Sequence, residues 1–444
     1  MKLSKLIFWM LTLFLLVGTV FYVRDTEGPQ LQLTPKSPMV TSSSSFELSL
    51  SDVSGLRYFS LTTLQAGERF VLLQQDFLPG TKEERIVFDL SGAGLSDGEV
   101  LLEVMASDRD IYQWGGMNQS VLQVNYQIDN TPPQIVPAPG IPYIAQGGSG
   151  IVFYTLDEET VSDGILAGES FFPGYPLGEG RVALLSVPWR EWDDDFVFQY
   201  VARDPAGNQR LKRLPCRVSP RDFPEVQIRL PSASLAAKMD EFVGSAAVGD
   251  SAVERFLWVN NDLRQDNRQR LRELARHSAA EPLWQGGFLR QPRTARRGTF
   301  GERRTYSVDG VEIDRKDHLG IDLASVAQDA VIAANHGRVV FAGELGVYGN
   351  CVVVDHGLGL QTLYAHLSRA TAEVGAVLKK GEVLGHTGVS GLAWGDHLHF
   401  GVLIAGQPVN PQEWWDAEWV ESRINAPLRK ARGASTGTNE RVRE

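Results

Sequence analysis

The sequence has few cysteines and no excess of positive charge. Cys216 and Cys351 are the only cysteines in 444 residues. They fall in separate predicted domains, so a structural disulfide is not favoured. Cys351 lies in the apolar run Asn350–Val354, where a thiol acts as a small core group, and we assign it no metal role. Lys and Arg number 43 against 54 Asp and Glu, a net charge of −11. This charge argues against a nucleic-acid-binding protein.

The composition is that of a folded chain with several domains. It is 43% hydrophobic and 22% charged, typical of globular proteins. A chain of 444 residues is too long for one core. Residues 421–444 carry arginines in a Gly/Ser/Thr-rich segment. We predict a disordered, solubilising basic tail there rather than a polyanion-binding arm.

A long hydrophobic run lies near the N-terminus. Lys2 and Lys5 precede an uncharged stretch from Leu6 to Val23, which as a helix would be about 27 Å long, close to a bilayer core. We predict that residues 1–24 are an uncleaved signal anchor, a single-pass transmembrane helix in the inner (cytoplasmic) membrane, with the rest of the chain on the periplasmic side. A cleaved signal peptide is the alternative, and it would also export the body of the protein.

Short alternating runs separated by Gly, Pro, Asp and Ser clusters fill the next two hundred residues. The segment Asp25–Leu31 recurs in altered form as Asp129–Ile135, which indicates an internal repeat. The segment Tyr200–Asn208 resembles the closing strand and turn of bacterial immunoglobulin-like domains. We predict two immunoglobulin-like β-sandwiches, residues 25–130 and 131–222, which act as spacers or as contact surfaces for cell-envelope proteins.

The spacing of apolar residues changes twice between residue 223 and the predicted tail. Residues 223–282 show a broken apolar stripe with arginines and acids elsewhere, which predicts a helical linker. A sharper hypothesis is that this segment packs on the following domain and limits access to its cleft. Residues 283–420 return to strand patterns and predict an antiparallel-β domain. The predicted fold class is therefore mainly β, with an anchor helix, two sandwiches and a helical linker before the last domain.

Histidine is concentrated in that last domain. Of eight histidines, all but His277 lie between residues 318 and 399. His277 is interpreted as solvated surface. Three sit beside glycines and are interpreted as hydrogen-bonding turn residues: His336, His356 and His386. The remaining four are the candidates for chemistry: His318, His366, His397 and His399.

Two polar pairs have the spacing of a shared strand face. If extended, His318 and Asp322 point to one face with Gly320 between them, and His397 and His399 do the same. Two such strands can supply three nitrogen or oxygen ligands and leave a fourth position open, as in a catalytic zinc site. Either pair alone is weak evidence, because paired histidines on a strand are often polar surface.

The ordered combination of motifs is more specific. His318-x-x-x-Asp322, then Tyr364-Ala-His366, then His397-x-His399 resembles the lysostaphin/LytM-type zinc metallopeptidases that cut peptidoglycan. Further matches are Phe300–Arg303, Tyr348–Asn350 and Val409–Pro411. The resemblance covers residues 283–420, about a third of the chain.

The resemblance implies the roles of the site residues. His318, Asp322 and His399 would bind one Zn²⁺, and His366 and His397 would form a catalytic pair on its open side. The implied fold is a LytM-type catalytic domain, and the implied reaction is hydrolysis of an amide in peptidoglycan stem peptides or cross-bridges. The segment Trp394–Asp396 departs from the small-residue, glycine and proline pattern of many members, which leaves the cleft rim and the substrate choice open.

Two other functions compete with this one. Relatives that have lost ligands act as non-catalytic activators of other cell-wall hydrolases, but this chain keeps the three ligands and both further histidines. The segment Val374–Val383 resembles the strands of lipoyl-type carrier domains, but its lysines lack the motif of a modified lysine. An enzyme is therefore the preferred reading.

Overall fold

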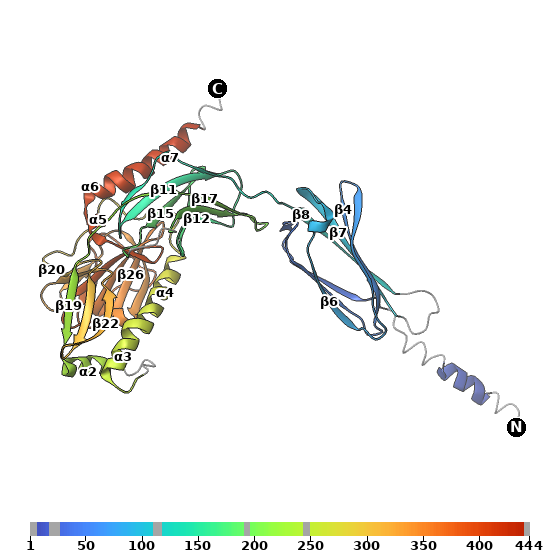
Figure 1. The fold of residues 1–444 in the computed structure, drawn as a ribbon, viewed down its shortest axis with the longest axis horizontal. Coiled ribbons are helices and arrows are strands. Elements are labelled where there is room, and N and C mark those ends of the chain that lie inside the picture. The colour runs from blue at the N-terminus through green and yellow to red at the C-terminus, as the bar shows by residue number, and fades with distance from the viewer. Residues whose placement is uncertain (1–6, 17–26, 110–117, 191–195, 243–248, 439–444) are drawn as a thin grey trace. The chain divides into compact units, whose positions relative to one another are not determined.

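The computed structural model describes residues 7–16, 27–109, 118–190, 196–242 and 249–438. The chain forms two compact units. Unit 1 comprises Met1–Pro133 and Arg203–Gln209, and unit 2 comprises Gln134–Ala202 and Arg210–Glu444. Both are built mainly from β-strands, as predicted, and each is described by itself (Figure 1).

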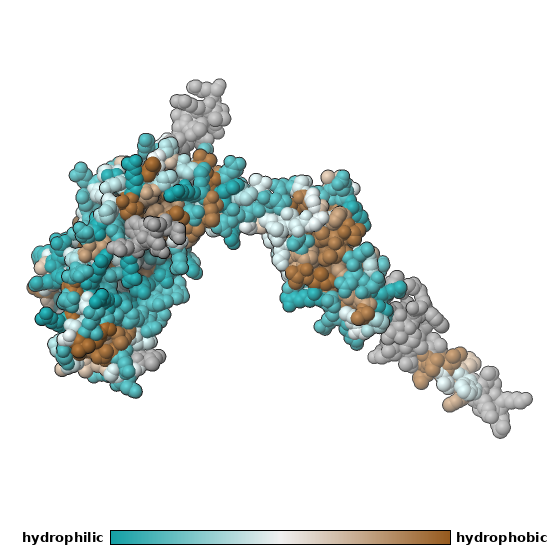
Figure 2. Space-filling view, in the orientation of Figure 1, coloured by the Kyte–Doolittle hydropathy of each residue, from teal (hydrophilic) through white to brown (hydrophobic). Residues whose placement is uncertain are grey.

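Unit 1 contains two sheets around one core. The first has the order β1-β3-β6, made of β1 (Gln30–Thr34), β3 (Phe46–Ser51) and β6 (Glu83–Phe88). The second has the order β2-β8-β7-β4-β5, made of β2 (Met39–Val40), β8 (Gln119–Ile128), β7 (Gly98–Asp108), β4 (Leu56–Gln65) and β5 (Glu68–Asp76). Phe46, Leu48 and Leu50 alternate with solvated residues and are buried, as a strand with one face on a core requires. Figure 2 shows hydrophobic residues on the visible surface of this unit.

The predicted anchor is not borne out by the described residues. Within the predicted anchor the structure describes residues 7–16, which are helical. Across the ranges that the structure describes, no helix combines the length and the apolar character needed to cross a membrane. Residues 1–6 and 17–24 of the predicted anchor lie outside the described residues.

Unit 2 begins with a second pair of sheets. One has the order β14-β15-β11-β9, made of β14 (Tyr175–Leu177), β15 (Gly180–Ser186), β11 (Ser149–Leu156) and β9 (Ile135–Pro137). The other has the order β13-β12-β16-β17, made of β13 (Ser170–Pro173), β12 (Ser162–Ala167), β16 (Phe198–Arg203) and β17 (Gln209–Arg213). Strands β10 (Tyr143–Ala145) and β18 (Arg217–Ser219) pair separately, in parallel.

The segment predicted as a helical linker is helical only in part. It opens with β19 (Glu225–Leu230), which pairs in parallel with β21 (Arg303–Val308). The helical elements follow: α2 (Ser232–Asp240), α3 (Ala252–Trp258), a π-helical turn η2 (Val259–Leu263) and α4 (Arg264–Ala275). Ser251 caps α3, because its hydroxyl accepts the Glu254 N–H and the Glu254 side chain bonds back. Phe256, Val259 and Leu271 are buried with residues of the C-terminal sheet, and Figure 1 shows α4 beside that sheet.

The C-terminal domain is a ten-stranded sheet whose main order is β20-β23-β30-β27-β26-β25-β28. Its strands are β20 (Ala295–Gly298), β23 (Ile321–Ala324), β24 (Ala330–Ile332), β25 (Gly337–Glu344), β26 (Asn350–Gly357), β27 (Leu360–Ala370), β28 (Val377–Leu378), β29 (Val383–Thr387), β30 (Leu398–Ile404) and β31 (Gln407–Val409). Strand β22 (Val311–Asp317) joins β21 and β19 in a smaller sheet. The neighbours of β30 on this path are β23 and β27, and both pairs are antiparallel.

Residues 421–438 are helical and differ from the predicted disordered tail, whose last residues, 439–444, lie outside the described residues. After β31 the chain forms α5 (Pro411–Trp415), α6 (Ala417–Val420), a π-helical turn η4 (Glu421–Asn425) and α7 (Ala426–Thr438). Ile424 and Leu428 are buried in the core that the second pair of sheets shares with the C-terminal sheet. Their spacing of four residues places them on one helix face, so tertiary packing orders a segment whose composition favours disorder.

A buried carboxylate joins this helical end to the second pair of sheets. Glu413 accepts the Ser149 N–H at 3.0 Å, and Arg221 lies 3.6 Å away. Burial is the main influence and raises the pKa of Glu413 to about 7. A carboxyl group whose pKa is higher in the folded state stabilises the fold below its unfolded pKa of about 4.5, and this stability is lost as pH rises through about 7.

We therefore expect Glu413→Gln to flatten the pH dependence of stability. A shift from 4.5 to about 7 corresponds to a loss of roughly 3 kcal/mol between pH 4.5 and pH 8. Urea unfolding of the wild type and the variant at several pH values measures this difference. Glu418→Gln, at an exposed position of α6, is the matched control. If the unfolding free energy depended on pH equally in the wild type, Glu413→Gln and Glu418→Gln, Glu413 would not be the cause of the dependence.

Candidate active site

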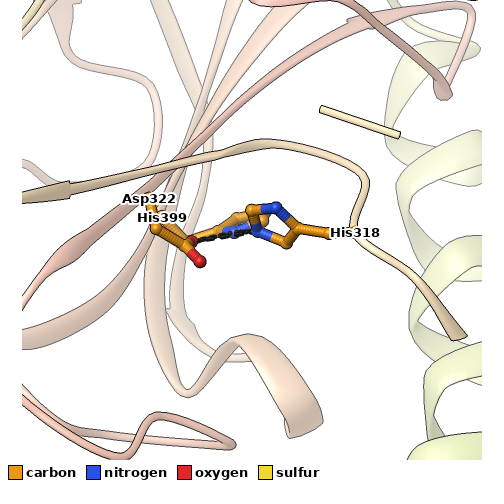
Figure 3. A group of neighbouring side chains, drawn as sticks. All are labelled: His318, Asp322 and His399. Carbon is orange, nitrogen blue, oxygen red and sulfur yellow. Dashed lines mark hydrogen bonds and ion pairs between the residues drawn. The ribbon is translucent and has the colours of Figure 1, made fainter. Parts of the chain in front are cut away.

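Three predicted ligands converge where β23 meets β30. Asp322 on β23 and His399 on β30 are directly opposed in the antiparallel register. His318 precedes β23, which begins only at Ile321, so the predicted extended strand does not reach it. Figure 3 shows its imidazole approaching Asp322 and His399 from the opposite side.

The geometry of these side chains fits a metal site. His318 Nε2 lies 3.0 Å from Asp322 Oδ1 and 3.0 Å from His399 Nδ1, and His399 Nδ1 lies 3.0 Å from Asp322 Oδ1. All three residues are buried. Ligands of a tetrahedral zinc ion lie about 3.3 Å from one another, given bonds of about 2.0–2.1 Å. The two nitrogen atoms and the oxygen atom would therefore have to move only slightly farther apart to hold such an ion.

Outer hydrogen bonds orient the ligands. His318 Nδ1 lies 2.8 Å from the Thr299 carbonyl oxygen, which makes it the donor and leaves Nε2 as the ligand atom. Arg304 donates to Asp322 Oδ2 at 2.9 Å and also contacts Glu302. Burial opposes ionisation of Asp322, but the charge of His318 and hydrogen bonds from histidines hold its pKa well below the usual range.

Arg304 was missed by the sequence motifs, which include its neighbour Arg303. Arg303 is exposed and is not among the residues that line the cavity, whereas Arg304 is. Successive residues of β21 point to opposite faces of the strand. The motif therefore ended one residue before the arginine that lines the cavity, on the face that points away from it. The available signal was the alternation along β21. It places the charged side chains of Arg303 and Arg304 on opposite faces, so that only one of them can face the ligands.

Two glycines leave room for the ligands. A Cβ added to Gly320 would lie 2.4 Å from His399 Nε2 and 2.8 Å from the Phe400 carbonyl oxygen. A Cβ added to Gly298 would lie 2.7 Å from Asp322 Oδ2. A side chain at either position would displace a ligand. The site therefore depends on the absence of a Cβ atom at Gly320 and Gly298.

His366 and His397 lie beside the ligands, with ring centroids 5.0 Å apart. His366 follows Ala365, the β27 residue opposite His399, and has φ of 62°. Its Nδ1 lies 2.9 Å from the Ser390 carbonyl oxygen, and His397 Nδ1 lies 2.7 Å from the Gly395 carbonyl oxygen. In both rings Nδ1 is thus the donor. This leaves Nε2 of His366 with a free lone pair, whereas Nε2 of His397 lies 3.6 Å from Asp322 Oδ1.

Burial and charge affect these histidines differently. Burial lowers the pKa of His399 to about 4 and that of His366 well below its ordinary value. Burial also acts to lower the pKa of His397, but the hydrogen bond and charge of Asp322 outweigh it and raise the pKa. His366 and His399 are therefore neutral at pH 7 in the absence of a metal.

The other histidines lie elsewhere, but His356 and His386 are in strands β26 and β29 rather than in the predicted turns. His356 is buried and bridges the His336 carbonyl oxygen and the Thr362 hydroxyl, which is a core network. His386 contacts Arg369, and His277 is exposed. None of them is among the residues that line the cavity next to the ligands.

A cavity of about 370 Å³ opens onto the site. His318, Asp322, His366, His397 and His399 all line it. The rim includes Trp394 and Asp396 from the segment that departs from the family pattern, and one wall is formed by residues of β19 and α4, Ile228 and Arg264.

Comparison with known proteins agrees with this geometry. The model of Peptidase family M23 matches residues 316–411. Mpg from Neisseria meningitidis, named a DD-carboxypeptidase/endopeptidase, is 46% identical over 94 residues, which cover 21% of this chain and 22% of the relative. ShyB from Vibrio cholerae, named a peptidoglycan DD-endopeptidase, is 30% identical over 111 residues, 25% of each chain.

These alignments span only about a quarter of the relatives' lengths or less. Among solved structures, the catalytic domain of lysostaphin from Staphylococcus simulans matches with 23% identity and a TM-score of 0.24, covering 28% of this chain and 92% of that domain. The family match therefore identifies residues 316–411, which carry every predicted site residue, as a Peptidase family M23 domain, and the predicted resemblance to this type of peptidase is confirmed.

Proposed function

We propose that this protein is a zinc-dependent endopeptidase that hydrolyses amide bonds in peptidoglycan stem peptides or cross-bridges during cell-wall remodelling. The observation that carries the proposal is one cavity lined both by three mutually close ligands and by two histidines whose Nδ1 atoms donate to backbone carbonyl oxygens. The names of the relatives, which include peptidoglycan DD-endopeptidases, support the substrate class.

The roles follow from the positions of the side chains. A Zn²⁺ held by His318, Asp322 and His399 would polarise the substrate carbonyl and lower the pKa of a water molecule. His366 and His397 line the same cavity, and an Nε2 lone pair there can accept a proton from the attacking water and return it to the leaving amine. The Ser390 and Gly395 carbonyl groups hold the two rings in the required tautomer.

The proposal places the domain outside the cytoplasm, where peptidoglycan lies. Lys2 and Lys5 before the apolar N-terminal run support export with the N-terminus at the inner membrane and the M23 domain in the periplasm. The sandwiches would then act as spacers or as contacts for envelope proteins. Fusing a reporter enzyme that folds only outside the cytoplasm to the C-terminus tests this placement, and an inactive reporter would contradict it.

Metal removal tests the activity. We expect one zinc per purified full-length chain by elemental analysis, complete loss of peptidoglycan digestion after chelation, and recovery when Zn²⁺ is added back. Mass spectrometry of the released muropeptides identifies the bond. One zinc per chain with no cleavage of purified sacculi would instead favour the non-catalytic LytM-type activator.

A further inference from the structure

The helical segment contributes an arginine to the catalytic cavity. Arg264 is the first residue of α4, and it lines the same cavity as His318, Tyr348 and His399. Figure 3 shows this segment, in pale green, on the His318 side of the ligands. The M23 family match begins at residue 316, so this wall of the cleft comes from outside the matched domain.

The segment is fixed on the M23 domain by buried polar contacts. Asn267 is buried and its Oδ1 accepts the Val347 N–H at 2.9 Å. A Cβ added to Gly346 would lie 2.5 Å from that oxygen, so the close approach depends on glycine. One turn before Arg264, Asn260 donates to Asp314 Oδ2 at 2.8 Å. Arg264 is therefore held in place before any substrate arrives.

The positive charge at this wall has no carboxylate partner within the described ranges. Arg264 Nε and Nη2 donate only to the neutral Asn260 Oδ1, at 3.2 and 2.7 Å. Arg268 lies one helical turn further on, and no ion pair joins it to a carboxylate in the part of the chain that the structure describes. Two like charges four residues apart destabilise a helix. Two further arginines line the cavity: Arg304 is neutralised by Glu302 and Asp322, and Arg297 is exposed to solvent.

The surroundings of Arg268 also carry positive charge. Burial is the largest influence and lowers the pKa of Arg268. Tyr348 acts to raise this pKa, and the nearby charges of Arg264, Arg190 and Arg272 act to lower it. Like charges held close together on the half-buried side chains of Arg264 and Arg268 cost stability in the free protein. An anion that enters the cavity would relieve the repulsion, and guanidinium groups bind carboxylates with paired, charge-assisted hydrogen bonds.

We propose that Arg264, supported by Arg268, binds a free carboxylate of the peptide substrate and makes the enzyme prefer it over the carboxamide form. The inference rests on the proposed function and adds a feature of the substrate. Stem peptides carry side-chain and terminal carboxylates near their cross-links, and amidation of such a group removes the charge that a guanidinium recognises. On this account the helical segment forms a wall that binds substrate, rather than a cover that excludes it.

The test uses the full-length zinc-loaded chain and two synthetic cross-linked stem peptides, one with free carboxylates and one fully amidated. For the wild type, kcat/KM is expected to be about tenfold or more higher for the carboxylate peptide, the scale of a charge-assisted hydrogen bond. Arg264→Gln is expected to remove this preference through KM for the carboxylate peptide and to leave the amidated peptide little changed. Arg270→Gln is the matched control, because Arg270 is exposed on the same helix and pairs with Glu273.

A binding measurement keeps the inference separate from the proposed activity. Calorimetric titration of the metal-free protein with the carboxylate and amidated cleavage products should show tighter binding of the carboxylate, lost in Arg264→Gln but kept in Arg270→Gln. If the wild type cleaves neither peptide, the proposed function fails and the titration alone decides the inference. Equal wild-type rates and equal affinities for the two forms would overturn it. Faster cleavage of both peptides by Arg264→Gln would overturn it in favour of a covering role. Unchanged melting temperatures show that the variants are folded.

Discussion

Replacing His399 by alanine is expected to abolish both zinc binding and peptidoglycan hydrolysis. His399 Nδ1 is 3.0 Å from both of the other proposed ligand atoms, and β30 carries it between β23 and β27. Without it His318 and Asp322 remain, and two ligands do not define a tetrahedral site. Metal affinity should fall by more than the roughly 10–100-fold that loss of an outer hydrogen-bond partner causes.

The fold should survive this change, so the loss can be assigned to the metal site. His399 Nε2 is buried without a hydrogen-bond partner among the described residues, and burial keeps the ring neutral at pH 7. Elemental analysis and sacculus digestion, with the melting temperature as a check on folding, measure the outcome. His386→Ala, on β29 and outside the cavity, should retain zinc and turnover. Full zinc occupancy in His399→Ala would rule out this ligand set.

The motifs selected residues that the structure brings together, because the central strand of the candidate site is regular. In β30, His399 faces the cavity while Leu398 and Phe400 belong to the hydrophobic core, as strict alternation requires. The same reasoning applied to His318 predicted that it lies with Asp322, as the structure shows, but gave the wrong local structure. The chain bends before β23, and the missing side chain of Gly320 gives the His399 ring its space.

Features that depend on distant packing could not be predicted. Arg264 reaches the cavity because α4 docks on the loop at Val347, about eighty residues later in the chain. The parallel pairing of β19 with β21 is likewise a long-range contact without a local signal. Ile424 and Leu428 order the C-terminal helices by packing on a shared core, although the surrounding sequence is basic and rich in small residues. Local periodicity carries no information about these partners.

His397→Ala is expected to keep zinc and lose turnover, which would separate the two histidines of one motif. His397 Nε2 lies 3.6 Å from Asp322 Oδ1, farther than the 3.0 Å of either proposed histidine ligand. Its Nδ1 is committed to the Gly395 carbonyl oxygen, and its side chain is 18% exposed against 8% for His399. A residue in this position can transfer a proton to or from the reacting groups without being needed to hold the ion.

The magnitude follows from that role. Loss of a general acid or base lowers kcat by about 10²–10⁴-fold, and KM should change little because the walls of the cavity remain. His366→Ala is the parallel variant, since its ring lies 5.0 Å from that of His397 and its Nδ1 is held in the same way. If the pair acts as one unit, the double variant should be little worse than either single variant. If His397→Ala lost as much zinc as His399→Ala, His397 would itself be a zinc ligand. The proposed ligand set of His318, Asp322 and His399 would then be wrong.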